Sequence, residues 1–172
     1  MPKNKVTVGD PAPTFKLESY NAGTIDLSAL MGKQKIVIIF SRYFGCPICQ
    51  LDLSEVLQIA PKITEKGAKL LYITQSGKEI ALKIIQEKNI TFPVIPSTKD
   101  ELYATYGLGK FTLSAMAALP GKLSAAKKAG FTHGEYEGSE TQCPGQFVID
   151  EKGNIIHAEK GWLNIETLLQ SL

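Results

Sequence analysis

Two of the three cysteines in this 172-residue chain lie close together, in the sequence Cys46-Pro47-Ile48-Cys49. Cysteines at this spacing can exchange with a disulfide, supply part of a zinc site, or pack as unreactive thiols. Zinc needs four ligands and the sequence has no second pair of this kind, so Cys143, His133 or His157 would have to complete the set. The residues favour redox chemistry, and the metal and packing alternatives stay open.

The pair lies where a strand gives way to a helix. Lys35–Phe40 is apolar and β-branched, which is typical of a central strand, and an apolar helical period runs from Pro47 to about Glu65. Pro47 suits the first helical position, because its missing N–H is not needed there. Cys46 is then the N-cap and Cys49 lies in the first turn.

This placement predicts a reactive thiolate. The first-turn N–H groups have no partner inside the helix, and the helix dipole adds partial positive charge near Cys46. In such settings the pKa of a cysteine falls from about 8.5 to roughly 3.5–7.5. We predict that Cys46, at the exposed tip, is the nucleophile and that Cys49, one turn in, is the resolving cysteine.

Neighbouring residues complete the expected site. Arg42 is a candidate partner of the thiolate, with a surface salt bridge as the equal alternative, while Asp52 and Glu55 oppose its charge. Tyr43 and Phe44 are expected to form pocket walls. The two histidines, His133 and His157, are expected to be solvated, and neither is proposed as a general base.

The remaining pattern alternates strands and helices within one domain, 1–172. It predicts a three-layer α/β core with a central mixed sheet, and an irregular or helical excursion at about 108–141 that is broken at Pro120-Gly121. The other expected elements are strands at Thr14–Leu17, Thr24–Leu27, Ala68–Thr74, Phe92–Ile95, Gln146–Asp150 and Asn154–Ala158, and helices at Lys78–Lys88, Asp100–Tyr106, Ser114–Ala129 and Ile165–Leu172.

Composition argues against two classes of protein, nucleic-acid binders and membrane-spanning proteins. Nineteen Lys and Arg against seventeen Asp and Glu give a formal charge of +2, which argues against a nucleic-acid partner. The longest apolar runs, such as Ile36–Phe40, are far shorter than the roughly 20 residues of a membrane span. Met1–Asp10 lacks the apolar core of a secretory signal. A cytoplasmic protein without a membrane partner is expected.

The order of four segments resembles the thioredoxin-like superfamily over nearly the whole chain, and most closely a CxxC-bearing, atypical subgroup of the peroxiredoxin-like AhpC/TSA family. The segments are the lead-in Val8–Leu17, Ile25–Lys33 before the apolar strand, Phe40–Cys49 with the cysteines, and Gln142–Asp150 with a proline loop. The resemblance implies a thioredoxin-like fold, with a central mixed sheet flanked by helices.

The resemblance also implies an antioxidant thiol oxidoreductase. Cys46 would attack a peroxide or a disulfide, Cys49 would resolve the product as a local disulfide, and a thioredoxin-type or other dithiol reductant would restore both thiols. No organic cofactor is expected, since no Gly-rich phosphate loop is present. A homodimer is a further state that the family allows. The alternatives are a disulfide reductase without peroxidase activity and a non-catalytic metal- or partner-binding module that uses Cys46, Cys49 and Cys143.

Two departures and one match refine the resemblance. Ile39 and Tyr43 stand where typical peroxiredoxins have Pro and Thr or Ser, so a phenol replaces the hydroxyl that orients peroxide. Pro144 matches the family's cis-proline position, which would turn Cys143 toward Cys46. Cys143 could then resolve an oxidised Cys46, bind metal or simply pack, and packing is the preferred interpretation.

Overall fold

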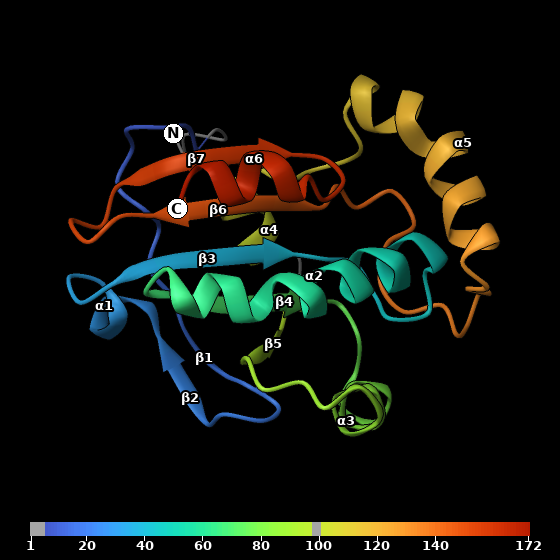
Figure 1. Ribbon diagram of the computed structural model, residues 1–172, viewed down its shortest axis with the longest axis horizontal. Helices are drawn as coiled ribbons and strands as arrows, with labels where there is room; N and C mark the ends of the chain where they lie inside the picture. Colours follow the sequence, from blue (N-terminus) through green and yellow to red (C-terminus); the bar gives the residue numbers. More distant parts are fainter. Residues whose placement is uncertain (1–5, 98–100) are drawn as a thin grey trace.

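A five-stranded mixed sheet forms the centre of the molecule. The computed structural model describes residues 6–97 and 101–172, and Figure 1 shows its sheet with the strand order β5-β4-β3-β6-β7. The strands β3 (Lys35–Phe40), β4 (Ala68–Thr74) and β5 (Val94–Pro96) are parallel, whereas β6 (Gly145–Ile149) and β7 (Ile155–Lys160) run antiparallel to their neighbours. The predicted mixed sheet is confirmed.

The central strand β3 is covered on both faces, as its apolar sequence predicts. Ile36, Ile38 and Phe40 pack into a core with Tyr103 and Phe147 on one face. Val37 and Ile39 pack into a second core on the other face, together with residues of the helix that follows β3. Because both faces of β3 are buried, the strand end that leads to Cys46 is fixed in place.

Helices lie on both sides of the sheet. The helix α2 (Pro47–Glu65), the helix α3 (Lys78–Lys88) and the C-terminal helix α6 (Ile165–Gln170) contribute to one core, and α4 (Glu101–Thr105) contributes to the other. Asp100, which was expected at the start of α4, lies outside the described residues. No helix in the described ranges is long and apolar enough to cross a membrane.

A small hairpin precedes this core. The strands β1 (Lys16–Glu18) and β2 (Thr24–Asp26) pair antiparallel, which confirms the predicted hairpin. The short helix α1 (Leu27–Leu30) was not predicted. It begins at Asp26, whose side chain accepts a hydrogen bond from the backbone N–H of Ala29 at 3.3 Å.

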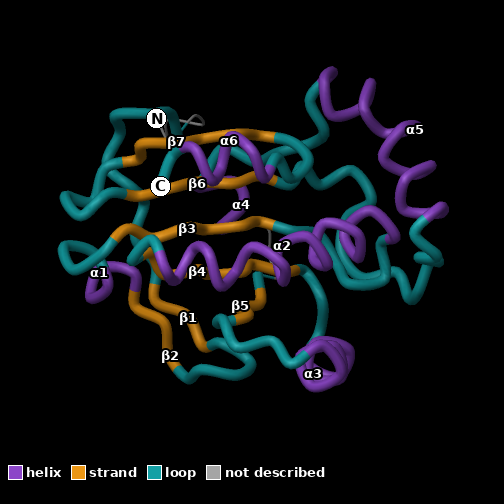
Figure 2. The backbone as a smooth tube through the Cα atoms, in the orientation of Figure 1, coloured by secondary structure: helices purple, strands orange, loops and turns teal. Residues whose placement is uncertain are grey.

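The predicted excursion contains one continuous helix, α5 (Leu113–Lys128), which stands beside the N-terminal part of α2 in Figures 1 and 2. The expected break at Pro120-Gly121 is wrong, because the helix runs through it. Thr112 caps its N-terminus, and Ala115 and Ala126 are buried on either side of the proline. Packing of both halves therefore holds together a helix that the proline weakens.

The third parallel strand also differs from its prediction. It covers Val94–Pro96 rather than Phe92–Ile95, and so it includes a proline. β5 is an edge strand that pairs only with β4. A proline is tolerated at an edge because its missing N–H removes no hydrogen bond from the centre of the sheet.

Candidate active site

The predicted helix start is confirmed at the CxxC segment. Pro47 occupies the first turn of α2, Cys46 is the N-cap, and the Cys46 sulfur accepts a hydrogen bond from the backbone N–H of Cys49 at 3.4 Å. Cys46, Cys49 and Cys143 are all free thiols. The two cysteines of the motif therefore share one end of α2, next to the carboxyl end of β3.

The surroundings of the two thiols shift their pKa values in opposite directions. The pKa of Cys46 is lowered to about 6, chiefly because the Cys49 thiol donates a hydrogen bond to its sulfur, with help from the Cys49 N–H and the charge of Arg42. Burial, and then the hydrogen bond and charge of Cys46, hold the pKa of Cys49 well above its usual value. At neutral pH Cys46 is therefore the thiolate and Cys49 the thiol, which are the forms required of a nucleophile and a resolving cysteine.

Arg42 makes both of the contacts that the sequence left as alternatives. Its Nη1 donates to the Cys46 sulfur at 3.6 Å, and its Nη2 lies 3.6 Å from the Glu140 carboxylate and donates to the Glu140 carbonyl at 2.9 Å. Arg42 is only 4% exposed, so the arginine of this ion pair is buried rather than on the surface. The arginine connects the nucleophile to a segment almost a hundred residues later.

Tyr43 is a buried wall of the site, as expected, but its hydroxyl is engaged. It donates a hydrogen bond to the Glu140 carboxylate and lies 3.1 Å from Nε2 of His133. The His133 ring stacks on Tyr136 with a centroid distance of 3.9 Å. Burial, and then the contact with Glu140, raise the pKa of Tyr43. Sequence reasoning missed the roles of His133 and Glu140.

The segment 131–141, here called the cover, closes over the motif. Gly134 N–H donates to the Gly45 carbonyl at 2.8 Å, and Gln50 donates to the Thr132 carbonyl at 2.9 Å. Cys46, which lies next to Gly45, is only 4% exposed. The prediction that Cys46 lies at an exposed tip is therefore wrong: it lies at the helix tip, but it is buried there in a cluster that includes Ala115 and Trp162.

The side of the site beneath α5 is apolar. Cys46 and Cys49 pack with Tyr43, Ile48, Ala115 and Trp162, and Phe111 and Leu119 lie against this group. The Trp162 indole N–H donates to the Ala115 carbonyl at 3.0 Å, which ties α5 to the loop after β7. The site is thus shielded from water in this conformation.

Asp52 is a buried acid that sequence reasoning treated only as an opposing charge. Its carboxylate lies 3.6 Å from Nζ of Lys122 on α5 and accepts a hydrogen bond from Leu163 N–H at 3.4 Å. Burial raises its pKa to about 7, although Lys122 acts against this shift. Asp52 therefore carries a charge at neutral pH only at a cost to stability.

Cys143 and Pro144 lie immediately before β6, the strand that pairs with β3. The Cys143 thiol is buried and donates to the Pro144 carbonyl at 3.3 Å, and burial raises its pKa. The peptide bond before Pro144 is trans, unlike the cis form implied by the resemblance. Within residues 6–97 and 101–172 no three His, Cys, Asp or Glu side chains gather as metal ligands.

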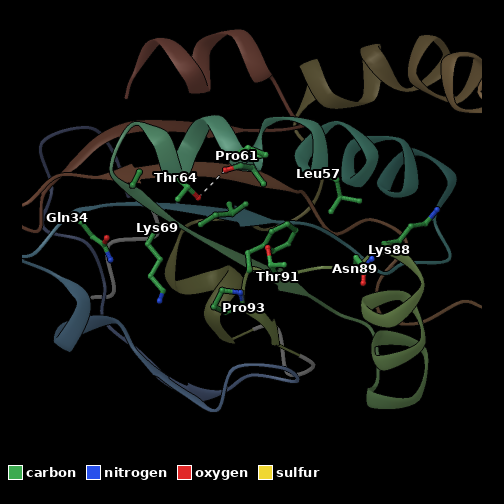
Figure 3. Close-up of a pocket in the computed structure, with 13 residues that line it drawn as sticks. Gln34, Leu57, Pro61, Thr64, Lys69, Lys88, Asn89, Thr91 and Pro93 are labelled. Carbon is green, nitrogen blue, oxygen red and sulfur yellow. Dashed lines mark hydrogen bonds between the residues drawn. The ribbon is translucent and has the colours of Figure 1, made fainter.

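Two cavities of the molecule are not lined by the cysteines. A cavity of about 550 Å³, drawn in Figure 3, lies between the C-terminal part of α2 and the segment around Thr91, with Pro61 and Thr64 on its wall. A second cavity, of about 440 Å³, reaches Phe44 and Gly45 but also contains no cysteine. Cys46 instead packs against Ala115 of α5 and Trp162.

The chain is similar in sequence to several known proteins. The model of the AhpC/TSA family matches residues 8–158. A thiol-disulfide oxidoreductase, ResA, of Bacillus thuringiensis is 27% identical over 124 residues, covering 70% of this chain and 69% of that protein. A prostamide/prostaglandin F synthase of Salmo salar is 26% identical over 149 residues, covering 83% of this chain and 74% of that protein.

Solved structures show the same fold. The peroxidoxin BcpB of Mycobacterium tuberculosis superimposes with a TM-score of 0.71 at 15% identity, covering 96% of both chains. A thiol:disulfide interchange protein of the DsbE type from Chlorobium tepidum gives 0.68 at 19% identity, covering 97% of this chain and 96% of that chain. The predicted thioredoxin-like fold is confirmed.

Proposed function

The chain belongs to the AhpC/TSA family and is a thiol-dependent oxidoreductase, and we propose that it works by cycling Cys46 and Cys49 between a dithiol and a local disulfide. The observation that carries this proposal is the position of two thiols at one helix end, where the Cys46 sulfur accepts hydrogen bonds from the Cys49 N–H at 3.4 Å and from Arg42 at 3.6 Å. These contacts help lower the pKa of Cys46 to about 6, whereas burial raises the pKa of Cys49 well above its usual value. The hydrogen bond between the two sulfurs keeps the resolving thiol next to the nucleophile.

The cycle follows from these charge states. The Cys46 thiolate attacks one sulfur of a substrate disulfide, forms a mixed disulfide and expels the other sulfur as a thiolate. Cys49 then loses its proton, attacks the Cys46 sulfur and expels the second thiolate. The substrate is reduced by two electrons and two protons, and the Cys46–Cys49 disulfide is left on the enzyme. A dithiol reductant, of the thioredoxin type or another, reverses this oxidation.

We favour a disulfide as the substrate. The Tyr43 hydroxyl, which stands where typical peroxiredoxins have the orienting hydroxyl, donates its proton to Glu140 in this conformation. This hydrogen bond directs the phenol proton at Glu140 while the cover is closed. The relatives named thiol-disulfide oxidoreductases support the same choice.

A peroxide is the second candidate, and Arg42 is the observation in its favour. A guanidinium 3.6 Å from the nucleophilic sulfur is suited to hold a peroxide oxygen beside the thiolate. Attack would break the O–O bond, convert Cys46 to a sulfenic acid and release water or an alcohol. Cys49 would then condense with the sulfenic acid, releasing water and giving the same local disulfide.

Both routes require the cover to move, because Cys46 is only 4% exposed. A substrate sulfur or oxygen must reach the Cys46 sulfur from the outside. We propose that the contacts of the cover with Gly45, Gln50 and Arg42 break transiently during each turnover. The thioredoxin-type reductant, a homodimer and a cytoplasmic location stay predictions.

Stopped-flow oxidation of the reduced protein tests the proposal. Hydrogen peroxide and dithiodiethanol are compared as oxidants, and the expected result is a faster reaction with the disulfide. Cys46→Ser should abolish both reactions, Cys49→Ser should accumulate a mixed disulfide with the model substrate, and Cys143→Ser should react like the wild type. A much faster reaction with peroxide would favour the second candidate, and a fully reactive Cys46→Ser variant would contradict both.

A further inference from the structure

A groove between α2 and α3 ends one residue from the nucleophile. This cavity of about 440 Å³ is within the range of roughly 300–1,000 Å³ that is typical of small-molecule sites. Its apolar lining consists of Phe44, Leu53, Leu57, Ile80, Ile84 and Phe131. At one end the groove reaches Gly45, which directly precedes Cys46. The disulfide cycle proposed above assigns no role to this groove.

The wall that α2 contributes to the groove leads toward Cys46. Its residues have the spacing of one helix face, and they are Gln50, Leu53, Ser54 and Leu57. Cys46 stands one turn before Gln50, and its carbonyl accepts the Gln50 N–H at 2.9 Å. The Gln50 side chain also donates to the Gly45 carbonyl at 3.2 Å. Because Gly45 has no side chain, it adds no bulk between the groove and the nucleophile.

Most of the groove does not depend on the closed cover. Phe131, Gly134 and Glu135 are the lining residues that belong to the cover, whereas the rest belong to α2, α3 and the segment just before α2. Both helices pack into the core of the sheet. The movement that breaks the hydrogen bond between Gly134 and Gly45 therefore removes only one wall of the groove, at the end next to Cys46. A substrate that reaches Cys46 then meets the open end of the groove.

The walls of the groove suit an uncharged aliphatic group. Three of the apolar lining residues are only partly buried, namely Leu57, Ile80 and Ile84, so they gain from covering by an apolar ligand. The charged lining residues are two lysines and two glutamates: Lys83, Lys88, Glu87 and Glu135. Their formal charges cancel, and Lys83 Nζ lies 3.9 Å from the Glu87 carboxylate. The lining therefore favours neither an anion nor a cation.

We propose that this groove binds an uncharged aliphatic arm of the substrate, the arm attached to the sulfur that Cys46 attacks. The inference names a substrate class for the proposed function and rests on it. The attack forms an S–S bond between Cys46 and that sulfur, breaks the substrate disulfide and releases the other sulfur as a thiolate. The bound arm stays on Cys46 in the mixed disulfide, one residue from the end of the groove. The groove residues thus determine which disulfides react fast.

A homologous series of disulfides tests the groove. The substrates are dithiodiethanol and its analogues with three-, four- and six-carbon arms, which all end in a hydroxyl and differ only in methylene groups. Rapid acid quench and intact mass follow their attack in a Cys49→Ser, Cys143→Ser background, where the reaction stops at the mixed disulfide. Each rate is divided by the rate with N-acetylcysteine, which removes differences in intrinsic reactivity. Because every substrate must pass the cover, the ratio of six-carbon to two-carbon rates does not depend on cover opening.

Each methylene buried in the groove should raise the rate by about two- to fourfold, so the six-carbon to two-carbon ratio should be at least about ten. Ser54→Phe, which fills the groove, and Ile84→Asn, which makes its wall polar, should each reduce this ratio to less than about three.

Leu82→Asn is the matched control on α3, because Leu82 is exposed and lies outside the groove lining, and it should keep the ratio of the background protein. Circular dichroism shows which variants fold, and Ser54→Phe is decisive if Ile84→Asn does not fold. A ratio near one in the background protein, or the same ratio in Ser54→Phe, would overturn the inference. If the background protein forms a mixed disulfide with none of the substrates, the proposed function itself is contradicted.

Discussion

Gly45 and Gly134 meet backbone to backbone directly beside the nucleophile. The N–H of Gly134 donates to the Gly45 carbonyl at 2.8 Å, and a Cβ built on Gly45 would lie only 2.2 Å from the Glu135 carbonyl oxygen. A Cβ on Gly134 would lie 3.2 Å from the Gly45 Cα. The absence of side chains at these two positions is what allows the cover to lie on the residue that precedes Cys46.

Gly45→Ala should therefore open the site. The added methyl would clash with backbone rather than with a flexible side chain, so the cover must shift away from Cys46. We expect alkylation of Cys46 by iodoacetamide to become several-fold faster, with a loss of about 1–3 kcal/mol in the free energy of unfolding. Peptide mass spectrometry gives the alkylation rate of Cys46, and urea unfolding gives the stability.

Gly109→Ala is the matched control, since a Cβ there meets nothing within 4 Å. It should alter neither the alkylation rate nor the stability by a comparable amount. If Gly45→Ala left Cys46 as slow to react as in the wild type, the cover would not be what limits access to the sulfur.

Arg42→Gln should raise the pKa of Cys46. The guanidinium favours the thiolate from 3.6 Å, and glutamine cannot supply the charge. At about pH 6 the variant should react with iodoacetamide several-fold more slowly, because less thiolate is present, and the difference should shrink at high pH. Lys62→Gln, at the opposite end of α2, should keep the wild-type profile. An unchanged Cys46 titration in Arg42→Gln would show that the arginine serves only the cover.

Two substitutions of Cys49 test whether its thiol lowers the pKa of Cys46. The hydrogen bond from the Cys49 thiol is the largest influence that lowers the pKa of Cys46 to about 6. Cys49→Ala removes this donor, so the Cys46 alkylation profile should move to higher pH. Cys49→Ser retains a donor and should move it less. Identical profiles for the two variants would mean that the side-chain hydrogen bond does not set the acidity of the nucleophile.

Asp52→Asn should remove a pH dependence of stability. The folded pKa of Asp52, about 7, lies above its usual 3.8, so its contribution to stability is full below about pH 4 and is lost as the pH rises through 7. Asparagine cannot ionise. The free energy of unfolding of the variant should therefore rise relative to that of the wild type between about pH 4.5 and 8, by at most about 4 kcal/mol. Urea unfolding of the reduced proteins at both pH values measures this gain.

The exposed Glu65→Gln on the same helix is the control for that experiment, and its stability relative to the wild type should change little with pH. Lys122, the ion-pair partner of Asp52, is 27% exposed and can turn to water when the carboxylate is lost. A gain by Asp52→Asn that is the same at both pH values would contradict the assigned pKa shift.

The sequence predicts the parts of the site that depend on neighbouring residues. The apolar run of β3, the proline at the first helical position and the spacing of the two cysteines are local signals, and together they place Cys46 at the N-cap. The hairpins and the mixed sheet follow from alternation and turn residues in the same way. These elements are confirmed because their driving forces act over a few residues.

The missed parts depend on contacts between distant segments. His133 and Glu140 lie 90 and 97 positions from Tyr43 in the sequence, and nothing in their own neighbourhood marks them as part of the site. The long excursion was the single signal that pointed to this region. Burial of Cys46 was missed for the same reason, since the glycines that admit the cover lie in different parts of the chain. The continuity of α5 through Pro120 likewise depends on packing rather than on local propensity.

The pairing of Cys46 with Cys49 is the central claim, and intact mass followed by peptide mapping after one turnover tests it most directly. Reduced protein is treated with one equivalent of dithiodiethanol, quenched in acid and digested without reductant. The account predicts a loss of two hydrogens from the intact protein and a disulfide that joins Cys46 to Cys49, with Cys143 still a free thiol. A disulfide that includes Cys143, or an intact protein that keeps both hydrogens while the substrate is reduced, would contradict it.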